Sequence, residues 1–136
     1  MSVSETIKNS KKTLFSFEIL PPIKGKGIES VKEIVDPLIE FNPQFINITS
    51  HREQFDSKNN RIRQRPGTVA IAAYLKFHYN ITVVPHILCG GFSRKETEYV
   101  LIDLYFIGIN NILCLRGDSL KRDGFYKPEP DGNTYA

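Results

Sequence analysis

The sequence lacks several features that mark whole classes of protein. No apolar run approaches the ~18 residues that a membrane-spanning helix requires. The first segment, MSVSETIKNSKK, contains no apolar stretch of the kind found in a secretory signal peptide. The sequence also holds no internal repeat and no low-complexity segment. We therefore expect a cytoplasmic protein that does not interact with membranes.

Cysteine is scarce, and its spacing argues against a metal or redox motif. The two cysteines, Cys89 and Cys114, lack the C-x-x-C spacing of zinc sites and of thioredoxin-like centres. Each lies close to an apolar run, and cysteine is among the most buried residue types. We expect two buried, reduced thiols and no metal site.

A strong charge of either sign is also absent. Eighteen basic and 15 acidic residues give a net charge of only +3 and are interspersed, which does not indicate a dedicated nucleic-acid binder. One basic cluster remains, because the long segment 50–65 ends in RIRQRP. Arg61, Arg63 and Arg65 could contact phosphates. We favour a solvated active-site loop, since no aromatic platform accompanies the arginines.

The chain has 136 residues, enough for one domain, and its apolar residues follow an alternating rhythm. Four short β-like runs, rich in Ile, Val, Phe and Leu, are typical of strands buried on both faces. They cover residues 14–20, 45–49, 82–88 and 111–115. Helical patterns lie between them at residues 28–41, 66–79 and 95–107. Residues 1–12 are polar and are predicted to be a frayed lead-in.

Local signals refine the three predicted helices. Pro37 lies inside the apolar stripe of the first, where it predicts a kink or a break. Pro66 stands near the start of the second. Ser93 and Glu96 form a capping-box pattern before the third, and Gly108 is placed to follow its end.

Strand–helix alternation of this length indicates an α/β fold with a parallel sheet of right-handed βαβ units. Periodicity leaves two architectures open, a doubly wound sheet and a closed barrel. Polar residues at the carboxyl ends of the runs favour a barrel, because those ends form the active-site rim of a (β/α)₈ fold. They are Glu18, Thr49, His86, Arg116, Gly117 and Asp118.

Each of these residues also has a plain structural interpretation. Glu18, buried among Phe15, Phe17 and Ile19, would have a raised pKa suited to a general acid, yet it could equally face solvent or pair with a lysine. A lone histidine such as His86 is more often a satisfied core residue than a catalyst. Threonine is common in strands, and Arg-Gly-Asp could be a surface turn.

The loop Cys-Gly-Gly-Phe-Ser at 89–93 joins the third run to a helix start and could offer backbone N–H groups to an anion. It matches neither the dinucleotide-binding nor the Walker A pattern, so this signal is weak.

Taken in order, FSFEILPP, FINITSHRE, VVPHILCGG, LCLRGD and a loop ending NTYA resemble the methylenetetrahydrofolate reductase family. The resemblance covers nearly the whole chain after the first dozen residues. It implies a (β/α)₈ barrel with FAD across its carboxyl rim, reduced by NAD(P)H and reducing 5,10-methylenetetrahydrofolate to 5-methyltetrahydrofolate.

The resemblance also implies roles for individual residues. Glu18 would be the general acid that protonates N10 of the folate, and Asp118 would lie between flavin and folate. The positions that resemble FAD contacts are Thr49, His86, Arg116, Gly117, Asp118, Tyr135 and Ala136.

A whole barrel of this type needs about 250 residues. We therefore expect residues 13–136 to be the N-terminal half of a TIM-type barrel that stops after its fourth strand. We also expect a homo-oligomer and no nucleic-acid partner. Two alternatives remain: a catalytically inactive half-barrel that binds a partner through its sheet edges, and an RNA-binding protein that uses the basic loop.

Overall fold

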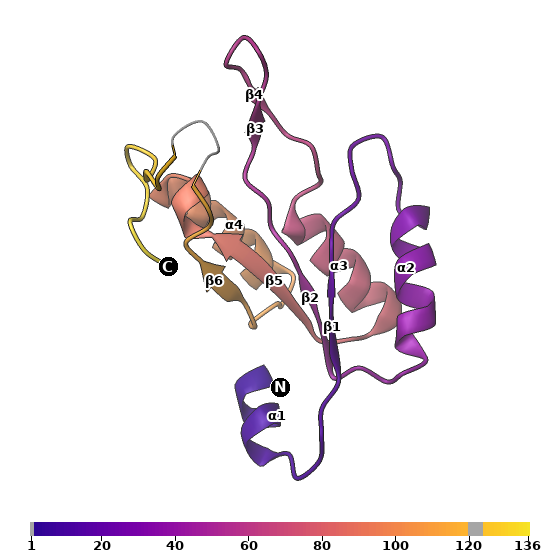
Figure 1. Ribbon diagram of the computed structural model, residues 1–136. Coiled ribbons are helices and arrows are strands. Elements are labelled where there is room, and N and C mark those ends of the chain that lie inside the picture. The colour runs from indigo at the N-terminus through magenta and orange to yellow at the C-terminus, as the bar shows by residue number, and fades with distance from the viewer. Residues whose placement is uncertain (1, 120–123) are drawn as a thin grey trace.

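The computed structural model describes residues 2–119 and 124–136. Four parallel strands form one sheet in the order β1–β2–β5–β6 (Figure 1). The strands are β1 (Ser16–Ile19), β2 (Phe45–Ile48), β5 (Val83–Leu88) and β6 (Leu113–Leu115). Three helices alternate with them, α2 (Glu29–Ile39), α3 (Thr68–Tyr79) and α4 (Arg94–Phe106). The predicted α/β class with parallel β/α units is confirmed, and the sheet is consistent with part of a TIM-type barrel.

Successive side chains of a strand point to opposite faces of the sheet, and one of these faces packs against the helices. Ile46 and Ile48 of β2 are fully buried in a core shared with Val35 of α2 and with Ala72 and Leu75 of α3. Burial on both faces, predicted for every run, holds only for β5, one of the two inner strands, in which all six residues are buried. All three residues of the edge strand β6 are exposed.

The N-terminal segment is not a frayed lead-in, so that prediction is wrong. Helix α1 spans Val3–Asn9 and begins with the same capping pattern as α4, since the Ser2 backbone N–H donates to the Glu5 carboxylate at 3.3 Å. The helix contains no buried residue. It is tied to the sheet by its Val3 backbone N–H, which donates to Asn111 Oδ1 at 2.8 Å just before β6.

Segment 50–65 is also more ordered than predicted. It forms an antiparallel hairpin of β3 (Gln54–Phe55) and β4 (Arg61–Ile62) that rises beyond the carboxyl ends of the sheet (Figure 1). The Asp56 carboxylate builds the turn, because it accepts hydrogen bonds from the backbone N–H groups of Lys58 and Asn60, each at 2.8 Å.

The helix signals are largely confirmed. In α4, Ser93 Oγ accepts from the Glu96 N–H, and the Glu96 carboxylate accepts from the Ser93 N–H. Gly108 follows the helix with a φ of 70°. Of the kink or break expected at Pro37, the break does not occur, since α2 continues to Ile39. Pro37 lies so near the helix end that few hydrogen bonds depend on it.

Candidate functional site

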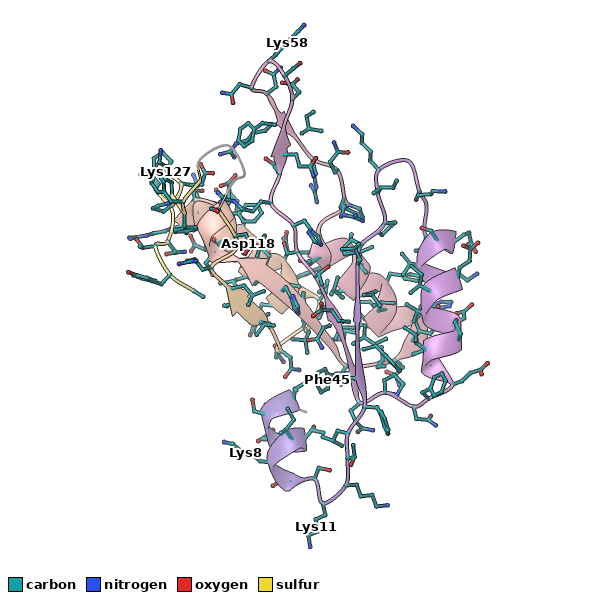
Figure 2. All side chains as sticks on the ribbon, viewed as in Figure 1. Lys8, Lys11, Phe45, Lys58, Asp118 and Lys127 are labelled. Atoms are coloured by element: carbon teal, nitrogen blue, oxygen red, sulfur yellow. The ribbon has the colours of Figure 1, made fainter. Side chains whose placement is uncertain are left out.

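A cavity of about 1190 Å³ opens at the carboxyl ends of the strands. Figure 2 labels Asp118 at this end of the sheet and Phe45, where β2 begins, at the other. The predicted residues that line it come from β1, β5 and the ends of β2 and β6: Glu18, Thr49, His86, Arg116, Gly117 and Asp118. The polar strand-end residues therefore converge, as expected for a barrel rim. Their individual roles stay predictions.

The strand period explains why these residues meet. Ile19 and Ile87 face the helix-side core. Their neighbours Glu18, His86 and Leu88 therefore face the cavity, together with Leu113 and Leu115 of β6. The cavity thus combines an apolar floor with a polar edge.

His86 is the buried polar residue of this cavity. Its residue is 5% exposed, and its Nε2 atom has no hydrogen-bond partner within the described part of the chain. Burial lowers the pKa of His86, and the nearby Glu18 carboxylate opposes this shift only in part. Near neutral pH the ring is therefore uncharged, and Nε2 is available to a bound ligand.

Glu18 is more open than its sequence context predicts. Its side chain is 58% exposed, and Phe15 is 61% exposed, so the expected burial among Phe15, Phe17 and Ile19 is wrong. The reason is alternation, because Phe17 and Ile19 point to the face opposite Glu18. The proposed general-acid role of Glu18 therefore has no support from burial. It rests on the position of Glu18 in the cavity.

Thr49 is fixed at the end of β2. Its backbone N–H and its Oγ1 both donate to the carbonyl oxygen of Ile19, at 3.1 and 3.3 Å. Oγ1 also lies 3.1 Å from His51 Nε2, and burial, followed by the charge of Arg65, lowers the pKa of His51. Because the hydroxyl gives its one proton to Ile19, it can accept a hydrogen bond from a neutral His51 that carries its proton on Nε2, and Thr49 is thus held at the cavity edge.

The turn after β6 is supported from several sides. Gly117 adopts a φ of 87°, which favours glycine. The Arg116 guanidinium lies 4.6 Å from the ring centre of Tyr126, a cation–π contact. The Arg116 carbonyl accepts from the Gly90 N–H at 3.0 Å.

Two predicted cofactor residues lie elsewhere. Neither Tyr135 nor Ala136 is among the described residues that line this cavity, and Tyr135 is 74% exposed. The segment before them pairs instead with the start of α4, where the Arg94 N–H donates to the Asp131 carbonyl at 2.9 Å. The structure therefore does not bring them to the other candidates.

The weaker sequence signals also change in the structure. In the 89–93 loop the N–H groups of Gly90 and Ser93 already have partners within the chain, so two of the donors that the anion-binding interpretation needs are engaged. Cys89 is buried, and burial raises its pKa, whereas Cys114 is exposed, contrary to prediction. Cys114 is exposed because β6 lies at the sheet edge.

The three arginines of the alternative, phosphate-binding interpretation are engaged within the chain. Arg61 lies 2.8 Å from the Glu129 carboxylate. Arg63 Nε donates to the Arg65 carbonyl at 3.0 Å, and the Arg65 guanidinium donates to the carbonyl of Pro21. These contacts remove the structural support for an RNA-binding loop.

Several residues that line the cavity do not stand out in the sequence, and Arg52 is one of them. Its side chain is only 12% exposed. Its place in FINITSHRE, three residues after a predicted strand end, is the available signal. Among residues 2–119 and 124–136, no three His, Cys, Asp or Glu side chains gather as metal ligands would. No helix in those same ranges has the length and apolarity to cross a membrane.

Comparison with known proteins places this arrangement in a family. The family model described as methylenetetrahydrofolate reductase matches residues 3–136. Methylenetetrahydrofolate reductase (NADH) 1 of Arabidopsis thaliana is 28% identical over 87% of this chain, and the 5,10-methylenetetrahydrofolate reductase of Pectobacterium carotovorum is 29% identical over 84%. A probable methylenetetrahydrofolate reductase (NADPH) of Caenorhabditis elegans is 25% identical over 84%. The aligned part spans only 19%, 35% and 17% of these relatives, respectively.

Proposed function

Because the chain belongs to the methylenetetrahydrofolate reductase family, we propose that it forms part of an enzyme that reduces 5,10-methylenetetrahydrofolate to 5-methyltetrahydrofolate. The proposed cofactor is FAD and the proposed reductant is NADH or NADPH. The match of the family model to residues 3–136 carries the proposal. The activity is proposed for the complete protein, since the chain spans about a third or less of the relatives compared.

The lining of the cavity suits a flavin chemically. An isoalloxazine ring has apolar faces and a polar edge, and ligand sites typically pair an apolar lining with a few placed polar groups. Here Leu88, Leu113 and Leu115 supply the apolar lining. The buried Nε2 of His86, which has no hydrogen-bond partner within the described residues, is a polar atom that a bound ligand can satisfy. These observations support FAD binding.

Five residues would hold the cofactor: Thr49, His86, Arg116, Gly117 and Asp118. When bound, FAD supplies a two-electron carrier between the nicotinamide and the folate. The protein's part is to orient the ligands, exclude water and deliver one proton. Arg116 and the N–H groups of the Gly117 turn can donate to polar ligand atoms, while Asp118 can accept from a pterin.

Glu18 is the proposed proton donor. Opening the folate imidazolidine ring breaks a C–N bond, and the departing N10 needs a proton as the methylene carbon gains a hydride. The Glu18 carboxyl group faces the same cavity as His86 and Asp118, so a folate bound there can reach it. The openness of Glu18 is compatible with this role, because a general acid must contact its substrate.

The test uses the protein expressed over its full open reading frame. It should purify with flavin, and NADH or NADPH should bleach the flavin absorbance without oxygen. Adding 5,10-methylenetetrahydrofolate should restore the absorbance and yield one equivalent of 5-methyltetrahydrofolate. Protein without flavin, or flavin that the folate does not reoxidise, would contradict the proposal. Comparing the two nicotinamides in this assay assigns the reductant.

A further inference from the structure

Arg52 is a buried charge beside the candidate site. It lies in the segment between β2 and β3, and its side chain is 12% exposed. A guanidinium withdrawn from water is costly unless its N–H groups are paired. Its contacts therefore show what the buried charge is used for.

The guanidinium joins two segments that are distant in sequence. Nη1 donates to the backbone carbonyl of Asp118 at 3.0 Å, and Nη2 lies 3.5 Å from the Glu129 carboxylate. Arginine suits this double contact, because its planar fork presents several N–H groups in fixed directions. The Glu129 carboxylate, which also binds Arg61, shares its negative charge between the two arginines.

The stem of Arg52 passes two glycines. A Cβ atom at Gly91 would lie 3.1 Å from Arg52 Cγ, and one at Gly117 would lie 3.9 Å from Arg52 Cδ. At Gly91 a side chain would press directly on the arginine. Arg52, from the segment after β2, thereby contacts the loop after β5 and the turn after β6 at once.

We propose that Arg52 is a positioning residue for the ligand site, which fixes the turn Arg116–Gly117–Asp118 against the loops that follow β2 and β5. This inference rests on the function proposed above, because the turn supplies three of the proposed cofactor contacts. Arg52 acts through the backbone of Asp118 and leaves the Asp118 carboxylate free for ligand. Loss of Arg52 therefore displaces the turn without removing any proposed FAD contact.

Arg61 provides a matched control. It has the same charge and binds the same Glu129 carboxylate, at 2.8 Å, but its side chain is 47% exposed. The hydrogen bonds of its guanidinium that the structure records do not reach Asp118. Replacing Arg61 therefore removes a positive charge and a Glu129 contact while leaving the turn after β6 supported.

The experiment compares Arg52→Ala, Arg52→Lys and Arg61→Ala in the full-length protein. We expect Arg52→Ala to raise the Kd for FAD by about tenfold to a hundredfold, as for loss of a hydrogen bond from a charged donor. Arg52→Lys should recover part of this loss, because an ammonium can donate to one of the two partners. Arg61→Ala should bind FAD like the wild type.

A second readout does not depend on flavin or folate. In Arg52→Ala, amide hydrogen exchange over residues 113–119 should accelerate, while it stays unchanged in Arg61→Ala. Unchanged exchange in Arg52→Ala, or equal effects of the two alanine variants, would overturn the inference. A wild-type protein that binds no flavin would refute the proposed function alone, because the exchange result still tests Arg52.

Discussion

His86 Nε2 lies 3.7 Å from Glu18 Oε2, although their strands β5 and β1 are separated by β2. This distance is too long for a good hydrogen bond between the two groups, so each can make a hydrogen bond to a ligand instead. His86 is buried, while the Glu18 side chain is largely exposed to the cavity. The pair thus offers one desolvated, uncharged ring and one accessible carboxyl group.

Burial of His86 predicts a stability that depends on pH. Its folded pKa is lowered relative to the unfolded value of about 6.5, so the unfolded chain binds more protons between these two pKa values. Stability should therefore be complete above pH ~6.5 and decline as the pH falls through that window. Burial lowers the pKa of His51 as well, so His51 should also contribute to the loss of stability as the pH falls.

Melting temperatures of the full-length protein, recorded between about pH 7.5 and pH 5, measure this effect. The decline should be shallower in His86→Gln than in the wild type. His78→Gln, at an exposed histidine of α3, is the control. Identical slopes in His86→Gln and the wild type would show that His86 does not contribute.

Glu18→Gln should separate the two half-reactions. Transfer of a proton to the folate nitrogen should slow by about 10²–10⁴-fold, as is typical for loss of a general acid. Reduction of FAD by NADH or NADPH should change little, because it needs no proton from Glu18. Rapid-mixing absorbance measurements follow each step. Glu29→Gln, at a largely exposed glutamate of α2, is the control. Equal slowing of both steps would indicate a role in folding or flavin binding instead.

Gly90→Ala should disrupt the turn after β6. An added Cβ would collide with the Tyr126 hydroxyl and with the Arg116 carbonyl oxygen. We expect a destabilisation of ~1–3 kcal/mol from overpacking, together with weaker FAD binding. Gly27→Ala, where a Cβ meets nothing within 4 Å, should fall within about 0.5 kcal/mol of the wild type. Urea unfolding and flavin content test both variants, and a neutral Gly90→Ala would contradict the packing described.

The 136-residue chain by itself should associate and hold little FAD. In the described sheet β1 and β6 each have one unpaired edge, and Leu113 and Leu115 of β6 are 41% and 38% exposed. Unpaired apolar edges promote pairing with other chains. Size-exclusion chromatography with flavin absorbance checks this. A stable monomer with stoichiometric FAD and full turnover would refute it.

Local patterns predicted most of the fold. The Ser93–Glu96 box marks the start of α4 and Gly108 its end, and each signal lies within a few residues of the helix end that it marks. The same box at Ser2–Glu5 precedes a helix of only seven residues, in which the two apolar residues Val3 and Ile7 are too few for a periodic signal. The hairpin was missed because β3 and β4 have two residues each, too few for a periodic signal.

The site was predictable in outline and less so in detail. The carboxyl ends of parallel strands lie on one side of the sheet, so the residues at these ends can be predicted to converge. Alternation alone should have placed Glu18 opposite Phe17 and Ile19 and so away from the core. The contact from Arg52 to Asp118 spans 66 residues, and no local pattern encodes such a distance.

The hydrogen bond between Val3 and Asn111 has a consequence for the order of folding. It joins residues 108 positions apart, so α1 gains its anchor only after nearly the entire described chain is synthesised. Closing so long a loop costs conformational entropy that a single hydrogen bond does not repay. Docking of α1 therefore follows assembly of the sheet. During synthesis α1 therefore stays undocked until β6 has joined the sheet.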